Sequence, residues 1–381
     1  MFFSAVILVY GSVNYYLYVR GAQSLPGDSR VKTIYTIVVI FLVISFLAGR
    51  ILERYAVSFV SDALIWIGSF WLAAMVYFLL ISLSIDILRA IDHFLPFIDR
   101  IFRQPLILKK YLFPTVIVLV ILVVIGGHWN AAHPHIKKLD IQIAKESPID
   151  SLRIVAASDI HLGTIVGRDR FCKYVEMINA LNPDIILLPG DIVDEDLAPV
   201  IRQNLGQALT QLQATYGVFG ITGNHEYIGG AERAARYLQD HSVTMLRDAS
   251  VLIDSAFYVV GREDLSKTRF TGQKRKTLSE LIARVDTQLP VILLDHQPFN
   301  LDQSVRNGID LQLSGHTHNG QLWPFNYITN AIYEVSFGYK QKENSHFYVS
   351  CGVGTWGPPV RTSSRPEIVV LSVKFNKRNN P

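Results

Sequence analysis

Cysteine and charged residues are scarce in this chain. Its 381 residues include only Cys172 and Cys351, too few for a disulfide framework, and we expect two isolated buried thiols rather than a redox pair. Asp, Glu, Lys and Arg make up 18% of the residues, and the formal net charge is +4. Because no broad basic stripe occurs, a partner such as nucleic acid is not expected.

Long apolar runs are abundant instead. Half of the residues are hydrophobic, and the mean hydropathy is +0.26. Four apolar stretches lie at about 2–19, 33–49, 63–85 and 112–127, each near the ~20 residues that cross a bilayer. We therefore expect a membrane domain over 1–130 with four transmembrane helices. The first stretch has no basic start and no small-residue cleavage site, so we do not interpret it as a cleaved signal peptide.

The segments that flank the fourth apolar stretch are more polar. From Ile87 to Phe102, apolar residues recur every three or four positions, which predicts an interfacial amphipathic helix bent at Pro96. Residues 131–150 are polar and contain two prolines, which predicts a linker. A second domain is expected over 151–376, followed by a tail at 377–381.

Basic residues are unevenly divided among the loops. The loops after the first and third apolar stretches hold eight Lys and Arg, whereas the loop after the second holds two. Three lysines follow the fourth stretch, so the comparison becomes eight basic residues after the first and third stretches against five after the second and fourth. Since cytoplasmic loops are enriched in Lys and Arg, this count predicts that the second domain is extracytoplasmic.

In the second domain, polar motifs follow short apolar segments that read as buried strands. The segments lie at 154–157, 184–188, 218–221, 291–294 and 309–313, and helices are expected at 168–181, 196–213 and 277–285. This alternation predicts an α/β fold, in which the carboxyl ends of the strands converge on one crevice. Eight candidate functional residues follow the strand segments: Asp159, His161, Asp191, Asn224, His225, His296, His316 and His318.

These side chains are chemically suited to metal binding. They offer carboxylate, amide and imidazole ligands and no thiolate, a set that favours Mn²⁺, Fe or Zn²⁺ over Ca²⁺. Seven ligands are too many for one tetrahedral ion but suit two ions that share a carboxylate. Two ions roughly 3.5–4 Å apart can clamp a phosphoryl group, polarise its oxygens and supply a hydroxide in line with the leaving group. His225 would remain as a general acid or transition-state donor.

The order of these motifs resembles that of the calcineurin-like metallophosphoesterases. The resemblance covers about 152–375 and does not include the apolar stretches. The segment Gly354–Arg361 is similar to the membrane-associated bacterial branch of that family, which implies an integral protein of a bacterial inner or plasma membrane. The implied fold is a two-sheet α/β sandwich. The motifs are Asp159-x-His161, Gly190-Asp191-x-x-Asp194, Gly223-Asn224-His225-Glu226, His296 and Gly315-His316-x-His318.

The resemblance also implies a role for each residue. His225 would be the catalytic histidine beside the scissile phosphate, and Asp194 and Glu226 are interpreted as supporting residues rather than ligands. One metal would be bound by Asp159, His161, Asp191 and His318. The other would be bound by Asp191, Asn224, His296 and His316, with Asp191 bridging.

Two further segments bear on the substrate. Aromatic residues between Trp323 and Tyr339 are expected to pack as core, and the alternative is an apolar lip for a lipid tail. A basic loop is expected to be a solvated face, and the alternative is contact with anionic headgroups. The loop contains Lys267, Arg269, Lys274, Arg275 and Lys276.

The leading hypothesis is hydrolysis of a phosphodiester, pyrophosphate or phosphomonoester of a lipid or other membrane-surface substrate. One alternative within the resemblance is a UDP-2,3-diacylglucosamine pyrophosphatase-like enzyme of lipid A synthesis, which requires a cytoplasmic catalytic domain. Another is a membrane sensor with a structural dimetal site. A nuclease is not favoured, since the chain is membrane-tethered and lacks a basic stripe.

Overall fold

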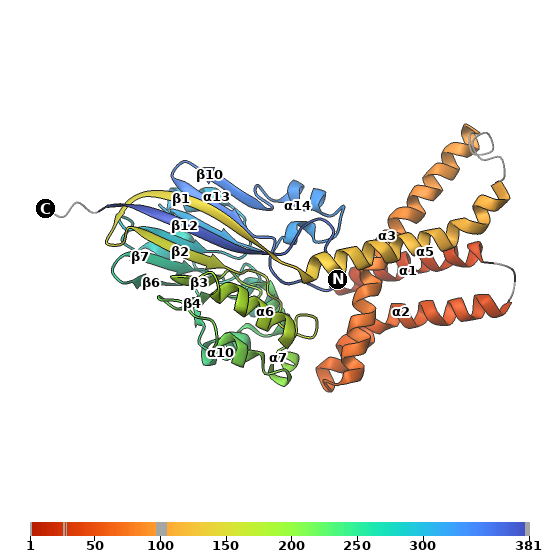
Figure 1. The fold of residues 1–381 in the computed structure, drawn as a ribbon, viewed down its shortest axis with the longest axis horizontal. Coiled ribbons are helices and arrows are strands. Elements are labelled where there is room, and N and C mark those ends of the chain that lie inside the picture. Colours follow the sequence, from red (N-terminus) through yellow and green to blue (C-terminus); the bar gives the residue numbers. More distant parts are fainter. Residues whose placement is uncertain (1, 26, 28, 97–104, 378–381) are drawn as a thin grey trace. The chain divides into compact units, whose positions relative to one another are not determined.

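The fold was analysed in a computed structural model, which describes residues 2–25, 27, 29–96 and 105–377 (Figure 1). The chain forms two compact units, Met1–His128 and Trp129–Pro381. The first consists of helices, and the second is a mixed α/β domain, as the sequence predicts.

The helical unit contains α1 (Phe2–Ser24), α2 (Ser29–Tyr55), α3 (Phe59–Phe94) and most of α5 (Pro105–Ala132). Among the described residues, three helical segments are long and apolar enough to cross a membrane: Arg30–Tyr55, Phe59–Phe94 and Tyr111–Ala132. The first predicted span is helical as α1, but α1 is not among these three, so its crossing stays a prediction.

Helix α3 differs from the prediction at its carboxyl end. Its 36 residues correspond to about 54 Å at 1.5 Å per residue. Ile87 to Phe94 continue this helix, so the expectation that a separate interfacial helix begins near Ile87 is wrong. No proline or glycine interrupts the helix there, and it ends at Phe94, with Leu95 as its C-cap just before Pro96. Residues 97–102 of the predicted interfacial helix lie outside the described residues.

The second unit is built on two six-stranded sheets, which confirms the predicted two-sheet sandwich. In both sheets the central strands are mostly parallel, and antiparallel pairing occurs at β12–β2, β10–β11 and β6–β7. The first sheet has the order β1 (His135–Ser147), β12 (Glu367–Lys377), β2 (Ser151–Ala156), β3 (Ile185–Leu188), β4 (Val218–Gly220), β5 (Thr244–Met245). The second has the order β10 (Gly338–Lys342), β11 (Ser345–Val349), β9 (Leu311–Ser314), β8 (Val291–Leu294), β7 (Phe257–Gly261), β6 (Ala249–Ile253).

The main core of this unit combines side chains from both sheets. Ile154 and Leu187 of the first sheet belong to the same buried cluster as Leu294 and Leu313 of the second. Strands β3, β8 and β9 are buried along their whole length, which explains why β3 and β8 are continuous apolar runs rather than alternating ones. In β9 the buried Gln312 is hydrogen-bonded to Ser304 and Ser314. Burial of these strands fixes the positions of the loops that follow them.

Helices cover the sheets. On β7 and β8, for example, Leu278 and Leu281 of α12 pack against Val260 and Leu293. The helix expected at 196–213 is divided into α7 and α8, because Asn204 between them adopts a left-handed conformation with φ of 51°. The helices are α6 (Arg168–Asn179), α7 (Ala198–Arg202), α8 (Leu205–Leu209), α9 (Asn224–Gly229), α10 (Ala231–Asp240), α11 (Lys267–Thr271), α12 (Leu278–Ile282), α13 (Leu301–Arg306) and α14 (Asn326–Ile332).

The predicted linker at 131–150 is largely strand β1, so that prediction is wrong. β1 pairs in parallel with β12, for example at Ile141 and Val373. Its charged side chains are exposed except Lys145, which is half-buried and pairs with Asp310, whereas Ile141 and Ile143 are buried. The two prolines flank this edge strand rather than interrupt it. Of the predicted tail at 377–381, only Lys377, the last residue of β12, is described.

The two cysteines are free thiols in different environments. Cys351 is buried, as expected, whereas Cys172 on α6 is only half-buried. The expectation of two buried thiols is therefore correct only for Cys351.

Candidate metal centre

The eight candidate residues lie just past the carboxyl ends of five strands, β2, β3, β4, β8 and β9. Several of them hold left-handed backbone conformations, which carry strain and are concentrated at functional sites. Such positive φ values are found at Asp159 (52°), His161 (53°), Asp191 (50°), His316 (72°) and His318 (48°). These turns direct the side chains of separate loops toward one another.

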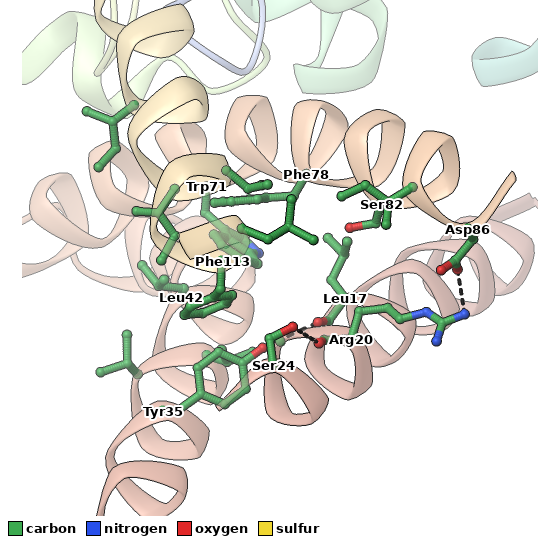
Figure 2. A pocket seen from close by; sticks show the side chains of 18 of the residues that line it. Leu17, Arg20, Ser24, Tyr35, Leu42, Trp71, Phe78, Ser82, Asp86 and Phe113 are labelled. Carbon is green, nitrogen blue, oxygen red and sulfur yellow. Dashed lines mark hydrogen bonds and ion pairs between the residues drawn. The ribbon is translucent and has the colours of Figure 1, made fainter. Parts of the chain in front are cut away.

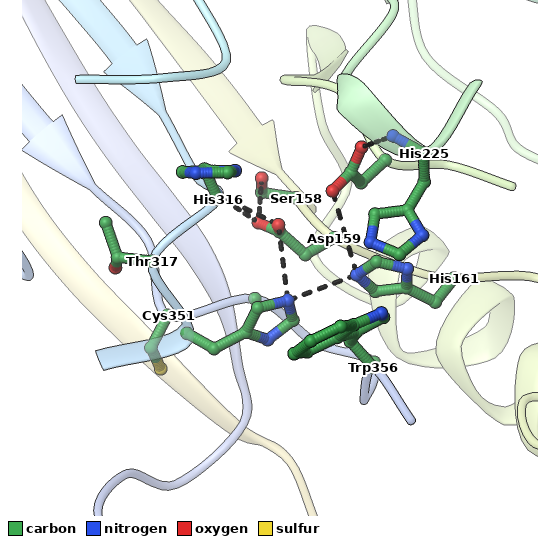
Figure 3. Close-up of polar contacts among 12 residues, drawn as sticks. Ser158, Asp159, His161, His225, His316, Thr317, Cys351 and Trp356 are labelled. Carbon is green, nitrogen blue, oxygen red and sulfur yellow. Dashed lines mark hydrogen bonds and ion pairs between the residues drawn. The ribbon is translucent and has the colours of Figure 1, made fainter. Parts of the chain in front are cut away.

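A first cluster joins the loop after β2 to the loop after β9 (Figure 3). The Nε2 atoms of His161 and His318 are 3.1 Å apart. Asp159 Oδ1 lies 3.5 Å from His318 Nε2, and Asp191 Oδ2 lies 3.9 Å from His161 Nε2. Two imidazole nitrogens and two carboxylates therefore face one small volume.

A second cluster joins the loops after β3, β4, β8 and β9. His296 Nε2 lies 3.1 Å from Asp191 Oδ2 and 3.3 Å from Asn224 Oδ1. His316 Nδ1 lies 2.7 Å from the same Asn224 oxygen. The structure thus brings Asn224, His296 and His316 together around Asp191, and each of the seven candidate ligands belongs to at least one of the two clusters.

Asp191 belongs to both clusters through one oxygen. Its Oδ2 approaches His161 and His296, whereas its Oδ1 accepts a hydrogen bond of 2.9 Å from the backbone N–H of His225. Burial alone would raise the pKa of Asp191, but His296 and His225 outweigh it and lower the pKa well below its usual value. An ionised carboxylate among buried imidazoles fits a divalent cation, so the arrangement is that of a divalent metal site.

His225 lies beside the first cluster at the start of α9. Its ring is 4.6 Å from the His161 ring, and its Nδ1 is 3.2 Å from Asp194 Oδ1 and 3.8 Å from Glu195 Oε1. Burial lowers the pKa of His225, but Asp191, Asp194 and Glu195 outweigh it and raise the pKa to about 9. Neighbouring carboxylates therefore favour a protonated His225.

Glu226 connects the loops that carry these residues. Its carboxylate accepts hydrogen bonds from the backbone N–H groups of Asp191 at 3.1 Å, Val193 at 2.8 Å and Gly223 at 2.7 Å. These bonds hold the loops after β3 and β4 in a fixed relation. Glu226 therefore positions Asp191 without facing the clusters, in line with its interpretation as a supporting residue.

Two residues near the first cluster were missed from the sequence. The Ser158 hydroxyl donates to Asp159 Oδ2, and Gly315 allows this contact, because a Cβ at Gly315 would lie 1.9 Å from the Ser158 Oγ. Arg361 is fully buried and donates from Nη2 to His318 Nδ1 at 2.9 Å. Arg361 lies within the recognised Gly354–Arg361 segment, but no spacing in the sequence relates it to His318.

The aromatic segment after His318 is more exposed than expected. Trp323, Tyr327 and Ile328 are 49%, 64% and 55% exposed, and α14 has no buried residue, so the core prediction is wrong for them. Tyr333 is half-buried, and its ring lies 6.1 Å from the His316 ring. On the other side, the exposed Trp356 has its ring 5.8 Å from that of His225. Aromatic side chains thus flank the clusters on two sides.

The basic loop is partly neutralised within the domain. Arg275 Nη1 lies 2.7 Å from Asp295 Oδ1, and Lys267 Nζ lies 3.6 Å from Glu263 Oε1. These pairs reduce the positive charge that the loop presents to a headgroup. Lys274 remains exposed, which agrees with the expected solvated face.

Comparison with known proteins identifies the family. The sequence model of the calcineurin-like phosphoesterases matches residues 152–320. An uncharacterized metallophosphoesterase of Campylobacter jejuni is 29% identical over 376 residues, and the match covers 98% of both chains. One from Aquifex aeolicus is 33% identical over 65% of this chain and 95% of its own length.

A protein described as a transmembrane protein is also similar to this chain. The transmembrane protein with metallophosphoesterase domain of Danio rerio is 32% identical over 68% of this chain and 62% of its own length. Together with the three apolar helices, this likeness indicates a membrane protein. The chain belongs to the calcineurin-like phosphoesterase family and is a metal-dependent phosphoesterase.

Proposed function

We propose that this protein is a membrane-anchored dimetal phosphoesterase that hydrolyses a phosphodiester, pyrophosphate or phosphomonoester of a lipid or another membrane-surface substrate. The observation that carries the proposal is the single Asp191 oxygen that approaches both histidine clusters. A carboxylate in that position can bridge two ions, and Mn²⁺, Fe or Zn²⁺ matches its neighbours.

In this proposal each cluster binds one of the two ions, and Asp191 is shared between them. Asp159, His161 and His318 would hold one ion with Asp191, and Asn224, His296 and His316 would hold the other with it. Bound there, two divalent ions would supply Lewis-acid polarisation of the phosphoryl oxygens and a lowered pKa for water.

His225 is proposed to protonate the leaving group. Its Nδ1 lies 3.2 Å from Asp194 Oδ1, and the neighbouring carboxylates raise its pKa, which favours a protonated imidazole. His225 Nε2 would then donate a proton to the leaving-group oxygen. Glu226 would keep Asp191 in place during this step.

Exposed apolar side chains beside the clusters support a lipid substrate. Large apolar side chains in contact with water mark binding surfaces when they are grouped. Here Tyr327, Ile328 and Ile332 are exposed on α14, whose C-cap is Tyr333, the neighbour of His316. We assign α14 as the contact for the apolar part of the substrate.

The double variant Tyr327→Ser/Ile328→Ser is expected to raise KM about tenfold for a phosphorylated lipid in mixed micelles. About 1.4 kcal/mol of lost apolar contact is enough for this change, since burial of one large side chain contributes ~1.5–3 kcal/mol. KM for p-nitrophenyl phosphate and bis-p-nitrophenyl phosphate should change less than twofold. The matched control is Ile201→Ser, which removes an exposed apolar side chain from α7. Equal effects on lipid and soluble substrates would contradict the assignment.

We further propose that the phosphoesterase domain is extracytoplasmic, because the loops predicted to be cytoplasmic hold the larger share of Lys and Arg. Alkaline phosphatase fused to the C-terminus is expected to be active. Green fluorescent protein fused to the same end should be exported as well and should not fluoresce. The opposite pattern would contradict this topology. It would make a cytoplasmic nucleotide-linked lipid precursor, such as UDP-2,3-diacylglucosamine, the first substrate to test.

A further inference from the structure

The helical unit contains a cavity of about 460 Å³ among α1, α2, α3 and α5 (Figure 2). This volume falls within the ~300–1,000 Å³ that is typical of small-molecule sites. All the lining residues precede His128, whereas every candidate metal ligand follows it. The cavity is therefore a separate site from the metal centre.

Most of the cavity wall is apolar. Leu17, Leu42, Phe78 and Phe113 contribute side chains to it, as Figure 2 shows. Along α3 the wall extends from Trp71 to Asp86, 15 positions further on, which is about 22 Å at 1.5 Å per residue. An elongated apolar space of this kind, lined by α1 and by three helices long and apolar enough to cross a bilayer, suits an acyl chain.

One end of the cavity is charged. Arg20 Nη2 lies 2.5 Å from Asp86 Oδ2, which also accepts a hydrogen bond of 2.6 Å from the Tyr16 hydroxyl. Arg89 Nη1 lies 3.7 Å from Asp86 Oδ1. Two guanidinium groups thus share one carboxylate, which leaves one positive charge in excess.

The charged end of the cavity is formed by residues near helix ends, which is where the headgroup of a bound lipid would lie. Arg20 is in the last turns of α1, and Asp86 and Arg89 are in the last third of α3. The nearby lining residues Tyr35 and Leu112 lie toward the amino ends of α2 and α5. Arg side chains near helix ends extend to the membrane interface, where they attract anionic lipids.

We propose that this cavity binds one anionic lipid, with its acyl chain between the helices and its headgroup at Arg20 and Arg89. A neutral amphiphile would leave the excess positive charge without a partner, and a water-soluble anion would leave the apolar wall unfilled. The site is independent of the substrate proposed for the metal centre, so either proposal can fail without the other.

Trp71 lines the cavity and provides a fluorescent reporter for the acyl chain. The full-length protein with its other four tryptophans replaced by phenylalanine would be reconstituted in phosphatidylcholine nanodiscs. Quenching of Trp71 would be measured as the fraction of brominated-chain phosphatidylglycerol or, in parallel, of brominated-chain phosphatidylcholine is increased. Because one Arg near the surface favours an anionic lipid by about fivefold, quenching should reach half its maximum at an about fivefold lower fraction of phosphatidylglycerol.

The double variant Arg20→Gln/Arg89→Gln should abolish this preference, whereas Arg54→Gln, on the exposed surface of the last turn of α2, should retain it. Native mass spectrometry of the protein with all its tryptophans gives a second readout, with one phosphatidylglycerol retained per chain. Equal quenching by both lipids, or a preference that survives the double variant, would overturn the proposal. So would equal retention of the two lipids in the mass spectra.

Discussion

Asp191→Asn is expected to lower phosphoesterase activity about a thousandfold and to remove metal from both clusters. The reason is that Asp191 Oδ2 approaches His161 and His296 at 3.9 and 3.1 Å, so that neutralising one side chain weakens two sites. Lewis-acid stabilisation by bound metal is worth several kcal/mol, and about 4 kcal/mol corresponds to a thousandfold in rate. Asparagine has about the same size as aspartate, and it keeps the Oδ1 atom that accepts a hydrogen bond from the backbone N–H of His225.

Metal content, measured by inductively coupled plasma mass spectrometry on the purified full-length variants, separates this role from a general loss of structure. His161→Asn should remove about one ion per chain, and Asp191→Asn should remove more than one. Asp169→Asn, an exposed carboxylate on α6, should keep both the metal and the activity. If Asp191→Asn retained two ions, Asp191 would not bridge them.

The same measurements test the alternative of a membrane sensor with a structural metal site. A sensor would bind metal in the wild-type protein without turnover of any phosphoester. If hydrolysis by the wild-type protein is lost upon chelation and restored by Mn²⁺, the sensor alternative is contradicted.

The strands and loops that form the site could be predicted from the sequence because their signals are local. Val291–Leu294 is a continuous apolar run followed by Asp295 and His296, and the structure has β8 with the predicted limits. Loops after parallel strands converge by topology. It was therefore possible to expect that His161 and His318, 157 residues apart, lie together without knowing any distance.

Features that depend on tertiary environment could not be predicted in this way. β1 was interpreted as a linker because an edge strand needs few buried residues, and pairing with β12, more than 200 residues later, supplies its stability. The aromatic residues of α14 have the composition of a core, but whether they face the core or solvent depends on the packing of α14. Arg361 reaches His318 through a loop whose shape no short-range pattern specifies.

His225→Gln is expected to lower kcat by about 10² to 10⁴, the usual contribution of general acid–base catalysis, and to leave metal content unchanged. His225 lies next to the first cluster, with its ring 4.6 Å from that of His161, but it is not among the seven proposed ligands. Its Nδ1 is oriented by Asp194, so the imidazole is held at the edge of the cluster. The control His133→Asn changes an exposed histidine of the same unit and should have no effect on kcat.

The choice of substrate makes this prediction specific for proton donation. A p-nitrophenolate leaving group needs little protonation, whereas the alkoxide of a lipid or sugar ester needs a proton as its bond to phosphorus breaks. His225→Gln should therefore reduce kcat for alkyl phosphoesters at least tenfold more than for p-nitrophenyl esters, with both substrates measured at the same metal occupancy. An equal loss on both would mean that His225 stabilises the transferring phosphoryl group instead. A parallel loss of one metal ion would make His225 a ligand, which its position within reach of His161 and Asp191 permits.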